Sequence, residues 1–289
     1  SGQSAGSAAG SEEEPPDANL TIQEPERTDV RAVQLPVGPL TDWSEAWAQA
    51  GGGHSGCNAV VYTVKAPDGS VYLDSQAALP GTLKTVEGTG AAVGDMLKAD
   101  GVYTVAEIAC FRDPIAASGD LDGMGLKNTG GYVFYDGNSD RWLDPAKPAA
   151  RQYLIDLASG CAAMGFDEIL LTDVSYPTEG KLNKIDYGAA AAALPGSLTD
   201  EITSFLKQMQ TALAEYGVKL SVLLPADLLL SGDPAGVSGQ SLSEIAPLVD
   251  RIYAAADDAS AAEHLQVAVT AAGKDTELVP VLADPDGMD

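Results

Sequence analysis

The stretch FDEILLTDV (166–174) decides the fold, because it is a short apolar run that ends directly in a carboxylate. Such a run fits a strand that is covered on both faces. Upstream of it, apolar residues recur at helical spacing at Tyr153, Leu154, Leu157, Cys161 and Met164. Asp144 is suited to cap that helix, with Pro145 at its first position and Gly165 just past its end. A second helical pattern follows at 197–216, so the stretch is predicted to be the strand of a helix–strand–helix unit.

The same alternation of strands and helices extends in both directions. Six further strands are predicted at 31–36, 57–66, 101–111, 218–226, 250–256 and 277–283. Strands that alternate with helices call for a parallel sheet, which is either an open doubly wound sheet or a closed (β/α) barrel. Seven strands are one fewer than a regular barrel has. A nucleotide-binding open sheet lacks its main support, because no glycine-rich phosphate loop follows the first strand.

Residues 1–26 differ in composition from the rest of the chain. They consist largely of Ser, Gly, Ala, Glu and Pro, with no large apolar residue before Leu20. This composition predicts a disordered tether and leaves residues 27–289 as one domain. It is also typical of an exported lipoprotein, so we expect an extracellular protein that a lipid anchor upstream of the sequence holds at the cell surface. The sequence has no run of about 18 apolar residues, so no transmembrane segment is predicted.

The chain is strongly acidic, with 42 Asp and Glu against 16 Lys and Arg and a formal net charge of −26. A surface of this charge repels phosphate backbones, which argues against nucleic acid as a partner; the simplest interpretation of the charge is solubility. Cys57, Cys110 and Cys161 fit neither a disulfide framework nor a zinc site, and the last two fall in apolar stretches typical of a core. The two histidines lie beside no convincing nucleophile. We therefore expect no cofactor and no transition metal, while the Asp-rich loops leave calcium open.

Carboxylates gather at the predicted C-terminal ends of the strands, which is where a (β/α) barrel carries its active site. Asp173 is the leading catalytic candidate, because it directly follows an apolar strand, and its candidate partners are Glu107, Asp227 and Asp284. Such a pair cleaves a glycosidic bond when one member donates a proton and the other attacks or activates water. The plain alternative is that an acidic protein places Asp in many turns. Glu168 lies earlier in its strand and is predicted to be structural, paired with Arg or Lys.

Basic and aromatic residues near the same strand ends are candidates for substrate binding. These candidates are Lys65, Arg112, Trp142 and Tyr176, together with Asp284. Flat aromatic faces suit the stacking of sugar rings. The aromatic-rich run at 130–145 is long enough to wall a sugar cleft, or to form a small hairpin packed on the barrel.

Several segments of the chain together match the pattern of a known family. The matching segments are 58–65 with Asp68-Gly69 and 71–75, then 111–114, 142–145 and 165–169, followed by Tyr176-Pro177. In these residues the chain resembles a bacterial family of glycosyl-hydrolase-like domains of unknown function, from about Val30 to Pro177. The resemblance implies a TIM-type (β/α) barrel, which on the strand count has an incomplete or irregular eighth strand, and an exported, Firmicutes-like setting.

The chain departs from that family's pattern at three positions of the barrel mouth. It has Thr63 where the family has an acidic residue, Thr172 where the family has its aspartate, and Ser175 where the family has an arginine. Asp173 stands one place beyond the family's aspartate, and such an offset in a strand points a side chain to the opposite face. Either Asp173 reaches the cleft from the start of the loop, or the catalytic pair has been lost.

Three functions are therefore open at the level of sequence. The first is a glycoside hydrolase that acts on an extracellular or cell-envelope polysaccharide through its rim carboxylates. The second is a barrel that binds glycan without hydrolysis, and the third is a structural module of the cell envelope. Carbohydrate is the expected partner of the first two, and we expect a monomer. A fold alone does not determine an activity, so the arrangement of the site residues has to distinguish these three functions.

Overall fold

The computed structural model describes residues 30–53, 56–74, 89–231 and 236–282, so the predicted tether (1–26) and Asp284 lie outside the described residues. The strands form one sheet, in which the spatial order follows the chain order and every neighbouring pair is parallel. They are β1 (Ala32–Gln34), β2 (Ala59–Lys65), β3 (Tyr103–Ala109), β4 (Glu168–Thr172), β5 (Lys219–Leu223), β6 (Arg251–Ala255) and β7 (Glu277–Val281). The predicted parallel sheet of seven strands is confirmed.

Helices connect the strands along the whole sheet. They are α1 (Trp43–Gln49), α2 (Gly90–Leu97), α3 (Pro114–Gly119), α4 (Pro148–Met164), α5 (Gly196–Leu213), α6 (Ala226–Ser231), α7 (Leu242–Ile245) and α8 (Ala259–Ala272). Short 3-10 helices lie at Leu182–Lys184, Gly188–Ala193, Ala214–Tyr216 and Ala246–Leu248. In the described ranges, no helix is both long and apolar enough to cross a membrane.

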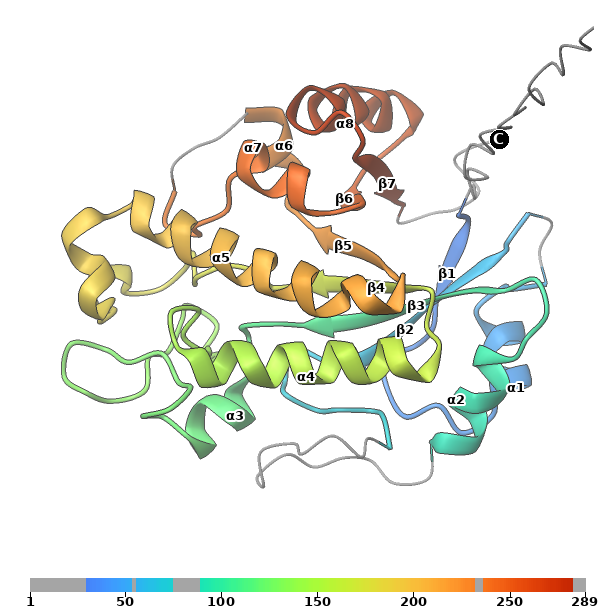
Figure 1. Ribbon diagram of the computed structural model, residues 1–289, viewed down its shortest axis with the longest axis horizontal. Coiled ribbons are helices and arrows are strands. Elements are labelled where there is room, and N and C mark those ends of the chain that lie inside the picture. Colours follow the sequence, from blue (N-terminus) through green and yellow to red (C-terminus); the bar gives the residue numbers. More distant parts are fainter. Residues whose placement is uncertain (1–29, 54–55, 75–88, 232–235, 283–289) are drawn as a thin grey trace, which may run out of the picture.

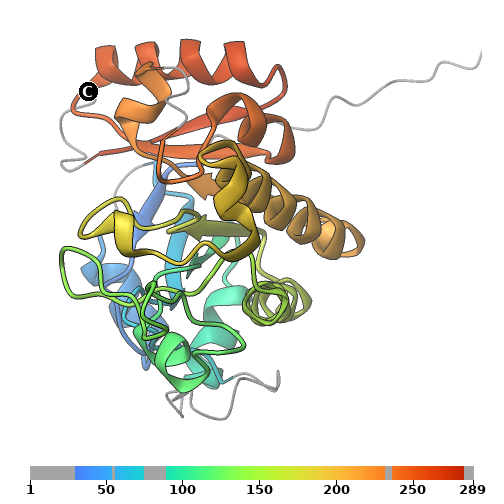
Figure 2. The same ribbon diagram turned by 90° about the vertical axis from the view of Figure 1, so that its left-hand side faces the viewer.

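The sheet is curled into a half-barrel. Because the strand order never reverses, the crossovers lie on one side of the sheet, as in a barrel. Helices α4 and α5 lie next to each other against the outer face, and α8 covers the end of the sheet formed by β6 and β7 (Figures 1 and 2). Within the described residues β1 and β7 are the two edges, and no strand joins them. The fold is thus a (β/α) barrel without a regular eighth strand, as the sequence predicts.

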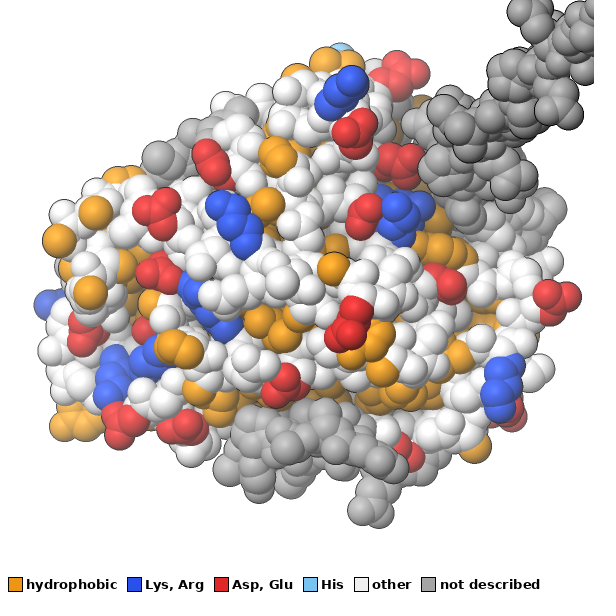
Figure 3. Space-filling model, viewed as in Figure 1, with side chains coloured by type: hydrophobic (Ala, Val, Ile, Leu, Met, Phe, Trp, Pro, Cys, Tyr) orange, Lys and Arg blue, Asp and Glu red, His pale blue; other side chains and the backbone are white. Residues whose placement is uncertain are grey.

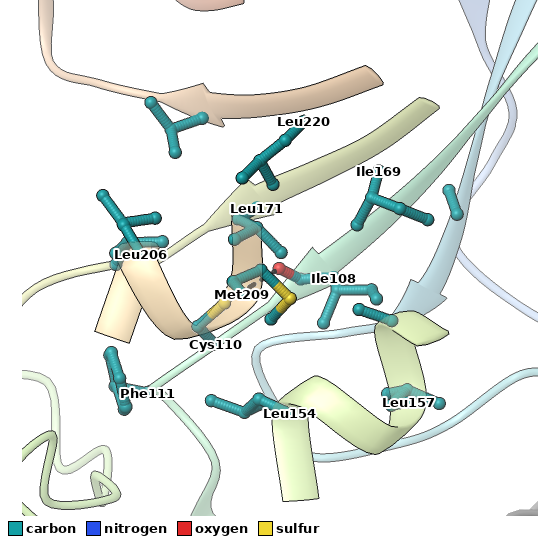
Figure 4. Packing of buried hydrophobic residues seen from close by; sticks show 14 of the residues in the cluster. Ile108, Cys110, Phe111, Leu154, Leu157, Ile169, Leu171, Leu206, Met209 and Leu220 are labelled. Carbon is teal, nitrogen blue, oxygen red and sulfur yellow. Dashed lines mark hydrogen bonds between the residues drawn. The ribbon is translucent and has the colours of Figure 1, made fainter. Parts of the chain in front are cut away.

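Apolar side chains fill both faces of the curled sheet. On the inner face Val61, Val105, Leu170 and Tyr253 form a small buried cluster. The larger core lies on the outer face, where side chains of β3, β4 and β5 pack against α4 and α5; among them are Ile108, Ile169, Leu171, Leu220, Leu154, Leu157, Leu206 and Met209 (Figure 4). Cys110 and Cys161 belong to this core, as predicted, and both are free thiols. Charged side chains of both signs are interspersed over the surface that carries these helices (Figure 3).

Helix α4 begins three residues later than the sequence predicts. Its first residue is Pro148, and Lys147 stands at the N-cap instead of Asp144. The reason is a turn, in which the Asp144 carboxylate accepts a hydrogen bond from Ala146 N at 2.9 Å and the Asp144 carbonyl accepts one from Lys147 N. The C-terminal end agrees with the prediction, because Gly165 has a left-handed φ of +106°.

A buried polar network fills the inner face near the beginning of the strands. The Glu168 carboxylate is fully buried and accepts hydrogen bonds from the hydroxyls of Tyr103, Ser221 and Tyr253 and from the Arg251 guanidinium. Arg251 is its ion-pair partner, so the structural pairing predicted for Glu168 is confirmed. A buried charge needs this degree of satisfaction, because removing it from water is otherwise very costly.

Replacing Glu168 with leucine is expected to lower the free energy of unfolding by about 3 kcal/mol or more, measured by urea denaturation. The change leaves the Arg251 guanidinium without its buried counter-charge and three hydroxyls without an acceptor. Lys219→Gln is the control, because Lys219 and its partner Asp250 are 52% and 40% exposed. That variant is expected to lose less than about 1 kcal/mol. Equal losses for the two variants would contradict the structural role of the buried network.

Candidate active site

Two carboxylates lie where β3 and β4 end, at the side of the molecule that Figure 2 faces. Glu107 lies in β3 opposite Thr63 of β2, on the inner face of the sheet. Asp173 directly follows β4 and has a φ of +50°, a left-handed conformation that is uncommon for residues other than glycine. The strict alternation of a strand therefore ends at Thr172. Asp173 is thus not forced onto the face opposite its neighbour, as the one-residue offset in the sequence suggests.

Burial changes the acidity of Glu107. Its pKa is raised, first because burial penalises the charged form. A hydrogen bond from the Thr63 hydroxyl to Glu107 Oε1, at 2.8 Å, opposes the shift by favouring the carboxylate. The negative charge of Asp173 adds to the rise, which places the two carboxylates within electrostatic range of each other.

Asp173 also has a raised pKa, and burial is again the largest cause. The cations of Arg112 and Lys65 oppose the rise, whereas the charge of Asp140 increases it. Arg112 is the direct partner, because its Nε lies 3.5 Å from Asp173 Oδ1. Its Nη1 lies 3.3 Å from Asp140 Oδ2, so one guanidinium connects two carboxylates at the rim. All three side chains are between 21% and 34% exposed, so solvent and a ligand can reach them.

Asp140 belongs to a short segment, residues 135–142, that we call the rim hairpin. Its two sides are joined by a bridge between Tyr135 and Arg141, and Trp142 forms a bridge to Arg112. The Asp136 carboxylate holds the turn together, since it accepts hydrogen bonds from two backbone amides of the turn and from Trp142 Nε1 at 2.9 Å. Trp142 is buried and supports this hairpin, and the substrate binding predicted for it stays a prediction. Tyr135 is the exposed aromatic ring of the hairpin, 53% accessible, with the Arg141 guanidinium 5.9 Å from its centre.

Lys65 does not line the cleft. The pairing of β2 with β3 shifts by one residue between Thr63 and Lys65, so Lys65 lies opposite Ile108 of the outer face. There its side chain is fully buried, 3.1 Å from Asp113 Oδ2, and it donates a hydrogen bond to the Ala109 carbonyl at 2.7 Å. These contacts give Lys65 a structural role beneath the rim, and no contact in the described structure bears on the substrate binding predicted for it.

The other predicted residues lie apart from the pair. Tyr176 is buried and packs inside the protein, with its ring 5.7 Å from that of Tyr187. Asp227 is exposed on α6 and accepts a hydrogen bond from Leu228 N, and no ion pair in the described structure joins it to the rim. Asp284 lies outside the described residues. Of the sequence candidates, the structure therefore brings together Glu107, Asp173 and Arg112.

Asp140 is missed by sequence reasoning, whereas Tyr135 is one of several aromatic residues that the sequence offers for sugar stacking. No sequence pattern singles out Asp140, because its place at the rim depends on its contact with Arg112, which the folded hairpin brings about. Tyr135 lies in the aromatic-rich run at 130–145, whose composition indicates the segment as a whole but does not single out this residue. Both follow from the fold of the hairpin, whose bridges no local pattern specifies.

Two hollows of the described structure lie away from this rim. They have volumes of about 460 and 630 Å³ and are lined by residues near the N-terminal ends of the strands. Four of the six charged residues that line the larger one are paired with each other, Lys219 with Asp250 and Arg251 with Glu277. Both cations of the larger hollow are paired with carboxylates, whereas the rim holds two carboxylates of raised pKa beside a partly exposed arginine. We therefore take the rim as the candidate site.

Comparison with solved structures shows the fold of glycoside hydrolase barrels. A hypothetical protein from Ruminiclostridium thermocellum is 23% identical, with a TM-score of 0.56, over 66% of this chain and 96% of that one. The PgaB (BpsB) glycoside hydrolase domain from Bordetella bronchiseptica is 17% identical, with a TM-score of 0.53, over 76% and 72%. The GH20 β-N-acetylhexosaminidase from Streptomyces coelicolor is 16% identical, with a TM-score of 0.52, over 89% and 49%. At these identities the likeness concerns the fold alone.

Among curated proteins, none matches this sequence. Residues 53–255 match the family described as "Putative glycosyl hydrolase domain". This match covers more than half of the chain and includes Glu107, Arg112, Asp140 and Asp173. The chain therefore belongs to that glycosyl hydrolase domain family.

Proposed function

We propose that this domain is a glycoside hydrolase in which Glu107 and Asp173 form the catalytic pair. The observation that carries the proposal is the pairing of two half-buried carboxylates at the C-terminal rim, each with a raised pKa and only one of them beside a cation. A pair of titratable groups in unlike environments is what acid–base chemistry at a glycosidic bond requires. The family membership supports the same reaction class.

The environments of the two carboxyls suggest a role for each. Arg112 favours the charged form of Asp173, which suits a nucleophile or a base. Among the described residues no cation is paired with Glu107, whose carboxylate accepts a hydrogen bond from the Thr63 hydroxyl, and we therefore assign it the role of general acid. In the proposed reaction Glu107 donates its proton to the glycosidic oxygen as the bond to the anomeric carbon breaks. Asp173 attacks that carbon or deprotonates the attacking water, and in either case the leaving sugar departs as an alcohol.

The proposed substrate is an extracellular or cell-envelope polysaccharide. The tether-like composition of residues 1–26 supports an exported protein held at the cell surface. Tyr135 supports a carbohydrate ligand, because its exposed ring lies on the hairpin that reaches the catalytic rim through Asp140 and Arg112. The presence of Glu107 and Asp173 at the rim favours a hydrolase over a barrel that only binds glycan.

Asp173→Asn and Glu107→Gln are each expected to lower kcat/KM by about 10²-fold or more, because each removes a group that transfers a proton or attacks. Release of reducing ends from a panel of bacterial polysaccharides measures the rate. Asp156→Asn is the control, since Asp156 is exposed on α4 and contacts only Gln152 of the same helix. Melting temperatures should stay within a few degrees of the wild type. Full activity in Asp173→Asn would exclude Asp173 from the reaction.

The raised pKa values also predict how stability depends on pH. A carboxyl whose pKa is raised in the folded state binds its proton more tightly there than in the unfolded chain, so the stability it contributes is lost as pH rises through the raised pKa. The wild type should therefore lose more unfolding free energy between about pH 4 and pH 7 than the double variant Glu107→Gln/Asp173→Asn. Urea denaturation at a series of pH values measures both slopes. Parallel pH profiles for the two proteins would show that neither carboxyl is perturbed.

Tyr135→Ala is expected to weaken oligosaccharide binding about two- to tenfold, because the ring offers an exposed stacking surface. Calorimetry in an Asp173→Asn background measures the affinity without turnover. Tyr216→Ala is the matched control, since Tyr216 is 38% exposed and lines the cavity near the N-terminal ends of the strands. Equal effects of the two changes would argue against a subsite at the rim hairpin.

A further inference from the structure

A chain of hydrogen bonds runs from the edge strand β1 to the acid Glu107. Gln34 Nε2 donates to the Thr63 hydroxyl at 3.2 Å, and that hydroxyl donates to Glu107 Oε1 at 2.8 Å. Gln34 Nε2 also donates to the Leu35 carbonyl at 3.4 Å. The three side chains come from three neighbouring strands, β1, β2 and β3. The register places Thr63 opposite Glu107, whereas Gln34 lies opposite Val61 and its longer side chain reaches Thr63.

The direction of this chain follows from the inventory of donors and acceptors. The Leu35 carbonyl can only accept, so the atom of Gln34 beside it is the amide nitrogen, which must also donate to Thr63. A threonine hydroxyl has one proton to give. Because Thr63 receives a hydrogen bond from Gln34, its own proton is directed to Glu107. The glutamine thus removes the freedom of the hydroxyl to turn away.

We propose that Thr63, oriented by Gln34, is a positioning residue that determines which oxygen of Glu107 carries the acidic proton. The inference rests on the proposed role of Glu107 as the acid. Oε1 accepts from Thr63, so the proton of the neutral acid lies on Oε2. Within the part of the chain that the structure describes, Oε2 has no hydrogen-bond partner, which leaves its proton available to a glycosidic oxygen.

The groups around Glu107 determine in which direction the hydrogen bond from Thr63 shifts the Glu107 pKa. Asp173, at the end of β4, raises the Glu107 pKa, and the hydrogen bond from Thr63 lowers it. Of the nearby charges, Arg112 is paired with Asp173 and Asp140, and Lys65 is buried against Asp113 on the outer face. Loss of the Thr63 hydroxyl therefore raises the Glu107 pKa, because a donor to the carboxylate is lost while the opposing charge stays.

Thr63→Val is the test, because valine keeps the shape of this buried side chain and removes only the hydroxyl. The Glu107 side-chain carbon, followed by ¹³C NMR as a function of pH, should titrate at a higher pH than in the wild type. In the active enzyme kcat should fall about two- to tenfold with KM unchanged, and the alkaline limb of the pH profile should move up. Thr63→Ser restores the hydroxyl and should restore both properties.

Two further variants make the outcome decisive. Gln34 lies on the exposed edge strand, so Gln34→Leu should raise the titration midpoint of Glu107 by a smaller amount. This variant replaces Thr63→Val as the test if Thr63→Val does not fold. Thr203→Val, a buried threonine of α5 that bonds only to the Thr199 carbonyl, should change nothing. An unchanged Glu107 midpoint in both Thr63→Val and Gln34→Leu would overturn the inference. A raised midpoint in a protein whose wild type hydrolyses no glycan would support the contact and overturn the proposed function instead.

Discussion

The candidate site depends on one backbone turn, the left-handed conformation of Asp173 at the end of β4. An extended residue here would follow the alternation of the strand and leave the inner rim. The Asp173 carbonyl accepts a hydrogen bond from Phe111 N at 3.1 Å, which ties the turn to the end of β3. Its carboxylate forms an ion pair with Arg112. A left-handed non-glycine residue costs about 1–3 kcal/mol, so it persists because both neighbours hold it.

The rim in turn rests on a buried ion pair on the other face of the sheet. Lys65 and Asp113 have no solvent exposure, and Asp113 also accepts the first amides of α3. Buried charges of opposite sign need this geometry, because each would otherwise lose its hydration without compensation. The pair fixes the residues on either side of Arg112: Lys65 donates to the Ala109 carbonyl, and Asp113 follows Arg112 directly. The buried ion pair thereby fixes the backbone position of Arg112 at the rim.

The sequence predicts those features that depend on local pattern. The apolar runs identify the strands, the helical spacing identifies α4 and α5, and the depth of Glu168 in its strand indicates a structural role. The features that fail depend on register and long-range pairing. From the sequence Lys65 is predicted to lie at the rim, but the register shift between β2 and β3 turns its side chain to the outer face. Asp140 acquires its role only because a hairpin folds back onto Arg112, 28 residues away in sequence.

The departures at Thr63 and Thr172 therefore need not mean that catalysis has been lost. The Thr63 hydroxyl carries no charge, but it donates its proton in a hydrogen bond to the Glu107 carboxylate of the neighbouring strand β3. At the end of β4 the chain has its carboxylate one residue later, at Asp173, and the left-handed backbone conformation there keeps this side chain at the rim. A site of this kind is defined by where its charges and protons lie. Both carboxyls of this rim have a raised pKa and only Asp173 is paired with an arginine, and this asymmetry is the basis of the acid and base roles that we propose.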